Sequence, residues 1–200
     1  MAGTNPDVID ALAGIASGSS LDAVRARRPE ARIHAQATYR ALFEPASPGG
    51  VTSAERLAVG AFVAGLHRDP VTAGHFTARL APSGAAPALE EAVGAAVAAA
   101  STRGPYGRYP AGPLSREDAA GPRYRVDAGI RQALGPRLAA ALEHAHLLVF
   151  HPRDAAPADL EALLDAGWST TDVVTLSQIV AFLSFQIRVV AGLRILAGRP

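Results

Sequence analysis

Alanine recurs along almost the whole chain, whereas the residues that favour strands are scarce. Alanine loses no side-chain entropy when it enters a helix, so this bias predicts an all-α protein. A chain of 200 residues, 49% of them hydrophobic, is long enough to bury a core. We therefore expect a single domain spanning residues 1–200, or two closely packed helical halves.

Two residue types are missing, and their absence excludes several kinds of chemistry. The chain has no cysteine, and all 19 of its basic residues are arginine. Without cysteine there is no thiolate nucleophile, disulfide or cysteine-bound zinc. Without lysine there is no Schiff base, pyridoxal-phosphate anchor or Walker-type phosphate loop. Any activity must therefore depend on other side chains, and the sequence predicts neither a cofactor nor a metal site.

Charge and hydropathy indicate where such a protein works. A net charge of +1 does not favour a nucleic acid or an anionic membrane as partner. The most apolar run, Val173 to Ile187, is shorter than the ~18–20 residues that cross a bilayer, so it predicts a core helix. The first ten residues lack the basic start and apolar run of a secretory signal. We expect a soluble, cytoplasmic protein.

Helix-start signals divide the chain into segments. Thr52-x-x-Glu55 fits a capping box before a helix to Leu66 that is apolar on nearly every side. Asp69-Pro70 starts the next helix, and Ser169 can cap the last one. Helix ends at His67 and His151 are each followed by a short helix, a faint internal repeat that would fit two related halves.

Residues 103–125 form a proline- and glycine-rich insertion that forbids a continuous helix. Tyrosines and arginines, which are common at interfaces, lie between these breakers. The insertion either covers a pocket or a neighbouring subunit, or is a solvated surface excursion.

The segment from about Leu147 to Ile195 carries the most specific likeness to a known family. It contains a short helix ending in Leu-x-x-Ala-Gly, a capped turn, and a long apolar helix with Phe-x-x-Arg and a late Gly-Leu. Ala54-Glu55-Arg56 opens an apolar helix in a similar way. These features resemble peroxidase-related members of the carboxymuconolactone decarboxylase and alkylhydroperoxidase-D-like family, over roughly 52–80 and 147–196. The resemblance implies an alkylhydroperoxidase-D-like helical bundle.

The chain departs from the redox members of that family at the positions of their two catalytic cysteines. Those members carry a glutamate, a Cys-x-x-Cys pair and a histidine, and their chemistry needs both thiols. Anchoring the motif on Glu55 or on His75 gives two registers, and the cysteine positions fall on His67 and Pro70 or on Arg68 and Val71. Neither register supplies sulfur, so disulfide-cycling peroxidase chemistry is excluded.

The family's non-redox members need no cofactor, and their chemistry requires proton donors and acceptors near a carboxylated substrate. Glu55, His67 and His75 are the candidate catalytic residues, and Arg68 is the candidate substrate-binding residue. Each also has a structural interpretation, because Glu55 can cap its helix and His67 can end one. His75 can be an ordinary half-buried histidine.

Other polar residues are assigned to structure. His144 and His146 lie two apart on a helix and point away from each other, so they make a poor metal pair. Arg188 interrupts an apolar helix, and we expect it to pair with a buried carboxylate or with helix-end carbonyls.

Two functions remain open. The first is a cofactor-free decarboxylase- or isomerase-type enzyme acting on a small organic acid. The second is a non-catalytic scaffold, partner or ligand-binding protein, acting beside a cysteine-bearing family relative or alone. The family resemblance and the long apolar last helix also predict a homo-oligomer, either a dimer, a trimer or a hexamer.

Overall fold

The computed structural model describes residues 7–83 and 87–198, which form nine α-helices and no strand. The all-α prediction is therefore confirmed, while the first six residues, where no secretory signal was expected, lie outside the described part. The helices are α1 Val8–Ala13, α2 Ser20–Ala26, α3 Pro29–Phe43, α4 Ser53–Leu66, α5 Pro70–Leu80, α6 Pro87–Ala100, α7 Ala128–Phe150, α8 Pro157–Asp165 and α9 Thr170–Leu196.

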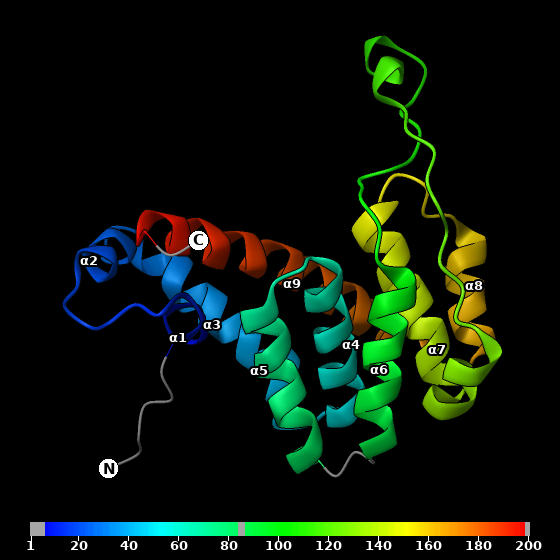
Figure 1. Cartoon of the computed structure of the whole chain (residues 1–200), viewed down its shortest axis with the longest axis horizontal. Helices are drawn as coiled ribbons and strands as arrows, with labels where there is room; N and C mark the ends of the chain where they lie inside the picture. Colours follow the sequence, from blue (N-terminus) through cyan, green and yellow to red (C-terminus); the bar gives the residue numbers. More distant parts are fainter. Residues whose placement is uncertain (1–6, 84–86, 199–200) are drawn as a thin grey trace.

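The helices form a body from which one segment projects (Figure 1). The helices α4, α5 and α6 stand side by side, and α9 runs across the molecule from α7 and α8 to the group formed by α1, α2 and α3. Residues 103–125 leave the body between α6 and α7 and carry the short 3-10 helix Pro113–Glu117 at their far end. We call residues 103–125 the arm.

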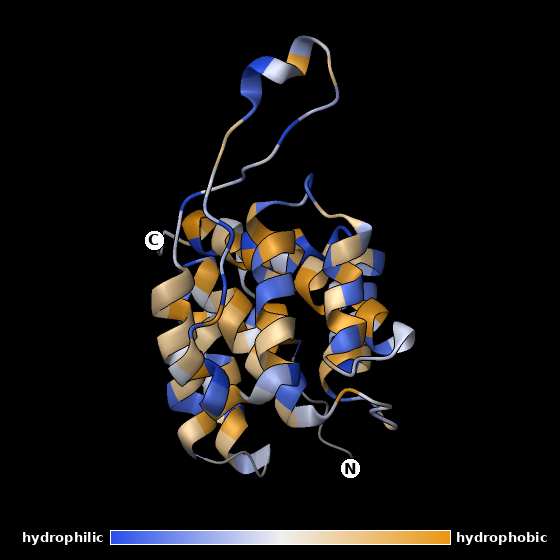
Figure 2. Ribbon diagram, turned by 90° about the vertical axis from the view of Figure 1, so that its right-hand side faces the viewer, coloured by the Kyte–Doolittle hydropathy of each residue, from blue (hydrophilic) through white to orange (hydrophobic). Residues whose placement is uncertain are grey.

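Helix α4 is the centre of the core and packs against α5, α6, α7 and α9. Its residues from Arg56 to Ala64 are all buried, which confirms the predicted burial on several faces. Gly60 and Gly65 allow this close packing, because a Cβ atom there would lie 2.8 Å from the Phe76 ring and 2.7 Å from Val97. Figure 2 shows apolar residues throughout the helical body and mostly polar residues along the arm.

The predicted caps are present. Thr52 and Glu55 form the capping box of α4, the Asp69 side chain accepts a 2.7 Å hydrogen bond from Thr72 N, and Ser169 caps α9. Helix α7 breaks at Gly135, whose φ of 76° lies in the left-handed region, immediately before Pro136. The helix pairs α4–α5 and α7–α8 are both joined through a C-cap histidine, but duplication of the halves stays a prediction.

Helix α9 differs from the sequence-based expectation in its length and in the partner of Arg188. The whole helix is longer than the charge-free run, and by length and composition it could cross a membrane, although 44% of its most apolar window is buried inside the protein. Arg188 was expected to pair with a buried carboxylate or with helix-end carbonyls, and its partner is instead a carbonyl within its own helix. Arg188 is exposed on the outer face of α9 and donates to the carbonyl of Ser184, one turn earlier. An arginine interrupts the apolar run because that face meets solvent.

A buried arginine fixes the connection between α3 and α4. The Arg56 side chain donates to three backbone carbonyls, Leu42 O at 2.7 Å, Pro48 O at 2.7 Å and Val51 O at 2.9 Å. It is only 5% exposed. The guanidinium therefore satisfies carbonyls that no helix pairs.

Replacing Arg56 with methionine removes these donors and leaves the carbonyls without partners in the core. We expect Arg56→Met to lower the free energy of unfolding by about 3 kcal/mol, measured by urea titration. Arg40→Met, at an exposed position of α3, is the matched control and should change stability little. Equal effects of the two variants would contradict this role for Arg56.

Candidate functional site: the Tyr39–His75 cleft

Glu55, the first predicted catalytic residue, is occupied by structural contacts. Its Oε2 atom accepts from Thr52 N at 2.8 Å and from Thr52 Oγ1 at 3.0 Å. Its Oε1 atom accepts from Arg137 Nε at 2.9 Å. Both oxygens are used, so the structure gives Glu55 a capping and bridging role in place of the expected acid–base role.

His67 and Arg68 lie in the turn between α4 and α5, and each has its own partner. His67 Nε2 is 3.2 Å from Ser184 Oγ of α9, and burial and the nearby Arg188 lower the pKa of His67. Arg68 has a left-handed φ of 57° and donates to Thr102 O at 3.3 Å, at the start of the arm. The structure therefore does not bring Glu55, His67, Arg68 and His75 to one point, and the single site we expected from them is not formed.

His75 alone of the four lines a cleft together with other polar groups. Its Nε2 atom lies 2.7 Å from the hydroxyl of Tyr39, which comes from α3. The cleft has a volume of about 320 Å³ and is lined by Val8, Ala11, Gln36, Tyr39, Glu44, His75 and Arg79. We call it the Tyr39–His75 cleft.

The hydrogen bonds of this cleft have a defined direction. Arg79 donates through Nη1 to the Tyr39 oxygen and through Nη2 to Glu44 Oε1 at 3.0 Å. The Tyr39 oxygen accepts from Arg79, and we assign its own hydrogen to His75 Nε2, the arrangement in which Tyr39 accepts one hydrogen bond and donates one. His75 then carries its ring hydrogen on Nδ1, where it can be donated to an oxygen atom.

Burial sets the charge states of this network. Burial lowers the pKa of His75, and the Arg79 guanidinium lowers it further, so the ring is neutral at pH 7. Burial raises the pKa of Tyr39 to about 12, with Arg79 opposing that shift and Glu44 adding to it. The resting cleft thus holds a neutral phenol and a neutral imidazole beside one arginine.

The wall of the cleft contains an unused donor. Gln36 Oε1 accepts from Val8 N at 2.8 Å, which fixes the orientation of the amide group. Gln36 Nε2 is buried and has no hydrogen-bond partner among the described residues. A buried donor without a partner costs about 1–3 kcal/mol, and this nitrogen exposes almost no surface to the cleft.

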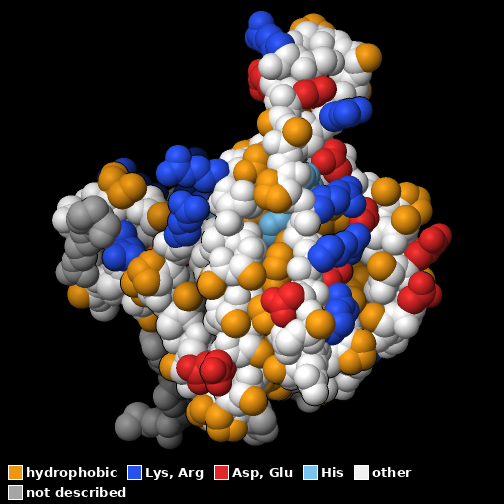
Figure 3. Space-filling model, turned by 45° about the vertical axis from the view of Figure 1, so that its right-hand side comes forward, with side chains coloured by type: hydrophobic (Ala, Val, Ile, Leu, Met, Phe, Trp, Pro, Cys, Tyr) orange, Lys and Arg blue, Asp and Glu red, His pale blue; other side chains and the backbone are white. Residues whose placement is uncertain are grey.

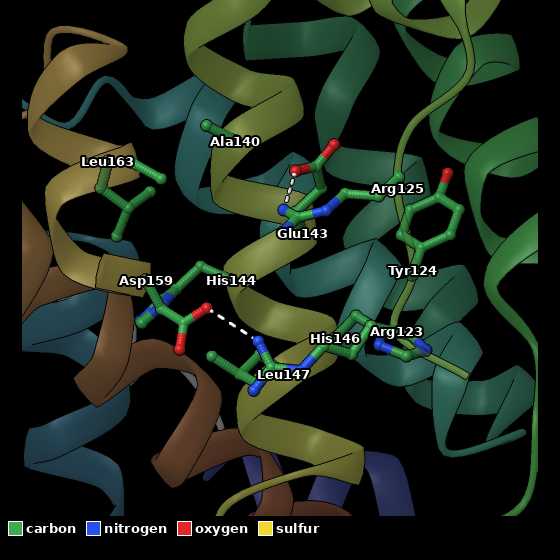
Figure 4. A pocket seen from close by; sticks show the side chains of 11 residues that line it. Arg123, Tyr124, Arg125, Ala140, Glu143, His144, His146, Leu147, Asp159 and Leu163 are labelled. Carbon is green, nitrogen blue, oxygen red and sulfur yellow. Dashed lines mark hydrogen bonds and ion pairs between the residues drawn. The ribbon is translucent and has the colours of Figure 1, made fainter. Parts of the chain in front are cut away.

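A second group of histidines lies along α7 (Figure 4). His144 Nε2 is 3.1 Å from Ser177 Oγ of α9, whereas the His146 ring contacts Tyr124, so the two histidines point to different partners as predicted. Arg123 and Arg125 of the arm extend over α7 to Asp159 at 3.0 Å and Glu143 at 2.7 Å. The cavity beneath them measures only about 40 Å³, enough for a few water molecules.

Among the described residues, no group of three or more histidine, aspartate or glutamate side chains is arranged to hold a metal ion.

The comparisons with family models, with curated proteins and with solved structures gave no match for this chain. The resemblance to the carboxymuconolactone decarboxylase family therefore stays a prediction.

His146 makes stability depend on pH. Burial and the neighbouring His151 lower its pKa to about 4, against the ordinary value of 6.5. Between these values the unfolded chain binds more protons than the folded protein, so stability falls as pH drops below 6.5. From pH 7 to pH 5 we expect His146 to account for a loss of about 2 kcal/mol.

The measurement is the free energy of unfolding at both pH values for the wild type and His146→Gln. The variant should lose less stability on acidification, while His34→Gln, at an exposed side chain, should behave like the wild type. If His146→Gln lost as much stability between pH 7 and pH 5 as the wild type, another group would be responsible for the loss.

Proposed function

We propose that the protein is a cofactor-free enzyme of decarboxylase or isomerase type that acts on a small organic acid in the Tyr39–His75 cleft. One observation carries the proposal, namely the chain of hydrogen bonds from Arg79 through Tyr39 to His75 at a surface cleft. Of the four residues that the sequence suggested, only His75 keeps a catalytic role in this proposal.

Each side chain has a part that follows from its chemistry. Arg79 would bind a carboxylate that stays in the product, because its planar guanidinium has donors beyond those given to Tyr39 and Glu44. His75 would donate its Nδ1 hydrogen to a substrate carbonyl, as a neutral imidazole can do in a site that disfavours its charged form.

The reaction would proceed through an enolate. In decarboxylation the bond to a second carboxylate breaks, its electron pair moves to the carbonyl oxygen, and carbon dioxide leaves. In isomerisation, the Glu44 carboxylate, which also lines the cleft, would take the proton next to the carbonyl and leave an enolate. As charge develops on the carbonyl oxygen, His75 gives it the Nδ1 hydrogen and takes the Tyr39 hydrogen at Nε2, while Arg79 balances the tyrosinate. Water, or protonated Glu44 in isomerisation, then gives a proton to the carbon. The enol hydrogen returns to His75 Nδ1, and the hydrogen on His75 Nε2 returns to Tyr39.

A second candidate function is ligand binding without chemistry. It is favoured by the raised pKa of Tyr39, about 12, because a phenol of that pKa gives up its proton reluctantly. In that case the same cleft binds a small acid through Arg79 and releases it unchanged. A scaffold beside a cysteine-bearing relative would show neither binding nor turnover here.

Turnover of small carboxylated lactones and β-keto acids separates these functions. We expect carbon dioxide release, or exchange of a carbon-bound hydrogen in heavy water, followed by proton NMR. His75→Leu should lower kcat by about 100-fold by removing the donor to the developing oxyanion. Arg79→Met should raise KM by about tenfold or more and also lower kcat, because the guanidinium binds the substrate carboxylate and balances the tyrosinate.

Glu55→Gln is the control, since it alters the capping and bridging contacts outside the cleft and should leave kcat of the folded protein unchanged. Circular dichroism and urea titration establish that each variant is folded. If His75→Leu and wild type turn over a substrate equally, the catalytic proposal fails. Saturable binding by calorimetry without turnover would establish the second candidate.

A further inference from the structure

We propose that the surface formed by the α4–α5 turn and the outer face of α9 binds a phosphate monoester that carries an apolar group. The residues that contact this ligand are Arg68 from the turn and Phe185 and Arg188 from α9, and we call them the Arg68–Arg188 patch. The patch is separate from the Tyr39–His75 cleft, so the inference does not rest on the proposed function.

His67 holds the two sides of the patch together. Its Nε2 atom lies 3.2 Å from Ser184 Oγ, so the turn packs directly on α9. Arg188 donates to the carbonyl of the same serine, and its positive charge adds to burial in lowering the pKa of His67. Because Arg68 follows His67 in the chain, the side chains of Arg68 and Arg188 start on either side of one imidazole ring.

The positive charge of the patch is not balanced within the part of the chain that the structure describes. Arg68 and Arg188 are exposed, each donates to a backbone carbonyl, and neither forms an ion pair there. The neighbouring carboxylate, Asp69, is only 8% exposed and caps α5 by accepting from Thr72 N. Figure 3 shows basic side chains gathered beside the base of the arm without an acidic one between them.

Two unbalanced guanidinium groups match a phosphate monoester in charge and in geometry. Such an ester carries about two negative charges at neutral pH, whereas a single carboxylate carries one. Guanidinium groups also bind phosphate oxygens through paired hydrogen bonds.

The backbone of Arg68 supports a role beyond the turn itself. Its φ of 57° lies in the left-handed region, and it is the only residue other than glycine with a positive φ among the described residues. A side chain is strained in this conformation, and such strain is common where a residue is held for a ligand. The 3.3 Å bond from Arg68 to Thr102 O, at an exposed position, is a weak reason to keep an arginine there.

Phe185 indicates what the phosphate is attached to. It is 51% exposed and lies three residues before Arg188, which places the two side chains next to each other on the helix surface. An exposed ring beside a cation offers apolar contact to a ligand whose charged end the arginine binds. The patch therefore fits an ester with an apolar group better than it fits phosphate alone.

Calorimetry with phenyl phosphate and with inorganic phosphate tests both parts of the patch. Both should bind saturably, and phenyl phosphate should bind more tightly by about fivefold through Phe185. Arg68→Gln and Arg188→Gln should each weaken both ligands by about tenfold or more. Phe185→Ser should remove the preference for phenyl phosphate and leave inorganic phosphate unchanged, which loss of folding could not explain.

NMR titration of His67 provides a second readout. Phenyl phosphate should raise the pKa of His67, because the bound phosphate offsets the Arg188 charge that lowers it, while the Asp69 carboxylate stays in place. Arg188→Gln should raise the pKa of His67 without ligand and reduce the further change on adding it. Arg40→Gln, at an exposed position of α3, is the control and should match the wild type in both experiments.

Vesicles separate the two sources of such a phosphate. Phenyl phosphate binding assigns the ligand to soluble esters. If instead only vesicles that contain phosphatidic acid bind, and phosphatidylcholine vesicles do not, the phosphate belongs to a lipid head group. Circular dichroism checks that all variants keep their helices. The proposal is overturned if no phosphate compound binds saturably, or if binding is the same in the wild type, Arg68→Gln and Arg188→Gln.

Discussion

The contacts of Arg137 join three segments of the helical body that are far apart in the sequence. This side chain follows the break in α7 and donates to Glu55 at 2.9 Å, to Gly50 O at 2.7 Å and to Gly167 O. Its guanidinium also lies 3.6 Å from the centre of the Trp168 ring. One arginine thus joins the start of α4, the middle of α7 and the turn before α9, where backbone carbonyls have few other partners.

The contacts of Arg137 bear on which of the candidate catalytic residues can act on a ligand. Glu55 belongs to the Arg137 network, and His67 binds α9, so neither is placed to act on a ligand with His75. The polar groups that do share a cleft come from α3 and α5, and they surround His75 with Tyr39, Arg79 and Gln36. The acid–base interpretation therefore moves from the α4–α5 corner to the Tyr39–His75 cleft.

The sequence was sufficient for features that depend on neighbours along the chain. Alanine content predicts the helices, and Thr52, Asp69 and Ser169 predict where three of them begin. The cleft could not be found in this way, because Tyr39 and His75 are 36 residues apart and meet only through the packing of α3 and α5. The one available signal was helical spacing, which places His75 and Arg79 one turn apart on α5.

The expectations for Glu55 and Arg188 differed from the structure for the same reason, because their surroundings depend on residues that are distant in the sequence. Glu55 satisfies a capping box, and the sequence shows that role, but its second partner lies 82 residues away. Arg188 was expected to need a buried carboxylate or helix-end carbonyls because its neighbours are apolar, yet it occupies the exposed face of α9 and donates within its own helix. Hydrophobic runs do not by themselves distinguish a helix buried all round from one with a single solvent-facing strip.

The proposed function requires that Tyr39 donates to a neutral His75 and that the Nδ1 hydrogen of His75 can reach an acid bound in the cleft. Nitrogen-15 NMR of the imidazole rings across a pH titration, with and without succinate as a non-reacting diacid, tests it directly. The account predicts that His75 carries its hydrogen on Nδ1, titrates below the ordinary value of 6.5, and changes its signals saturably with succinate. It also predicts that Arg79→Met abolishes the succinate response. A His75 ring that titrates at or above its ordinary value and does not respond to succinate would contradict the account.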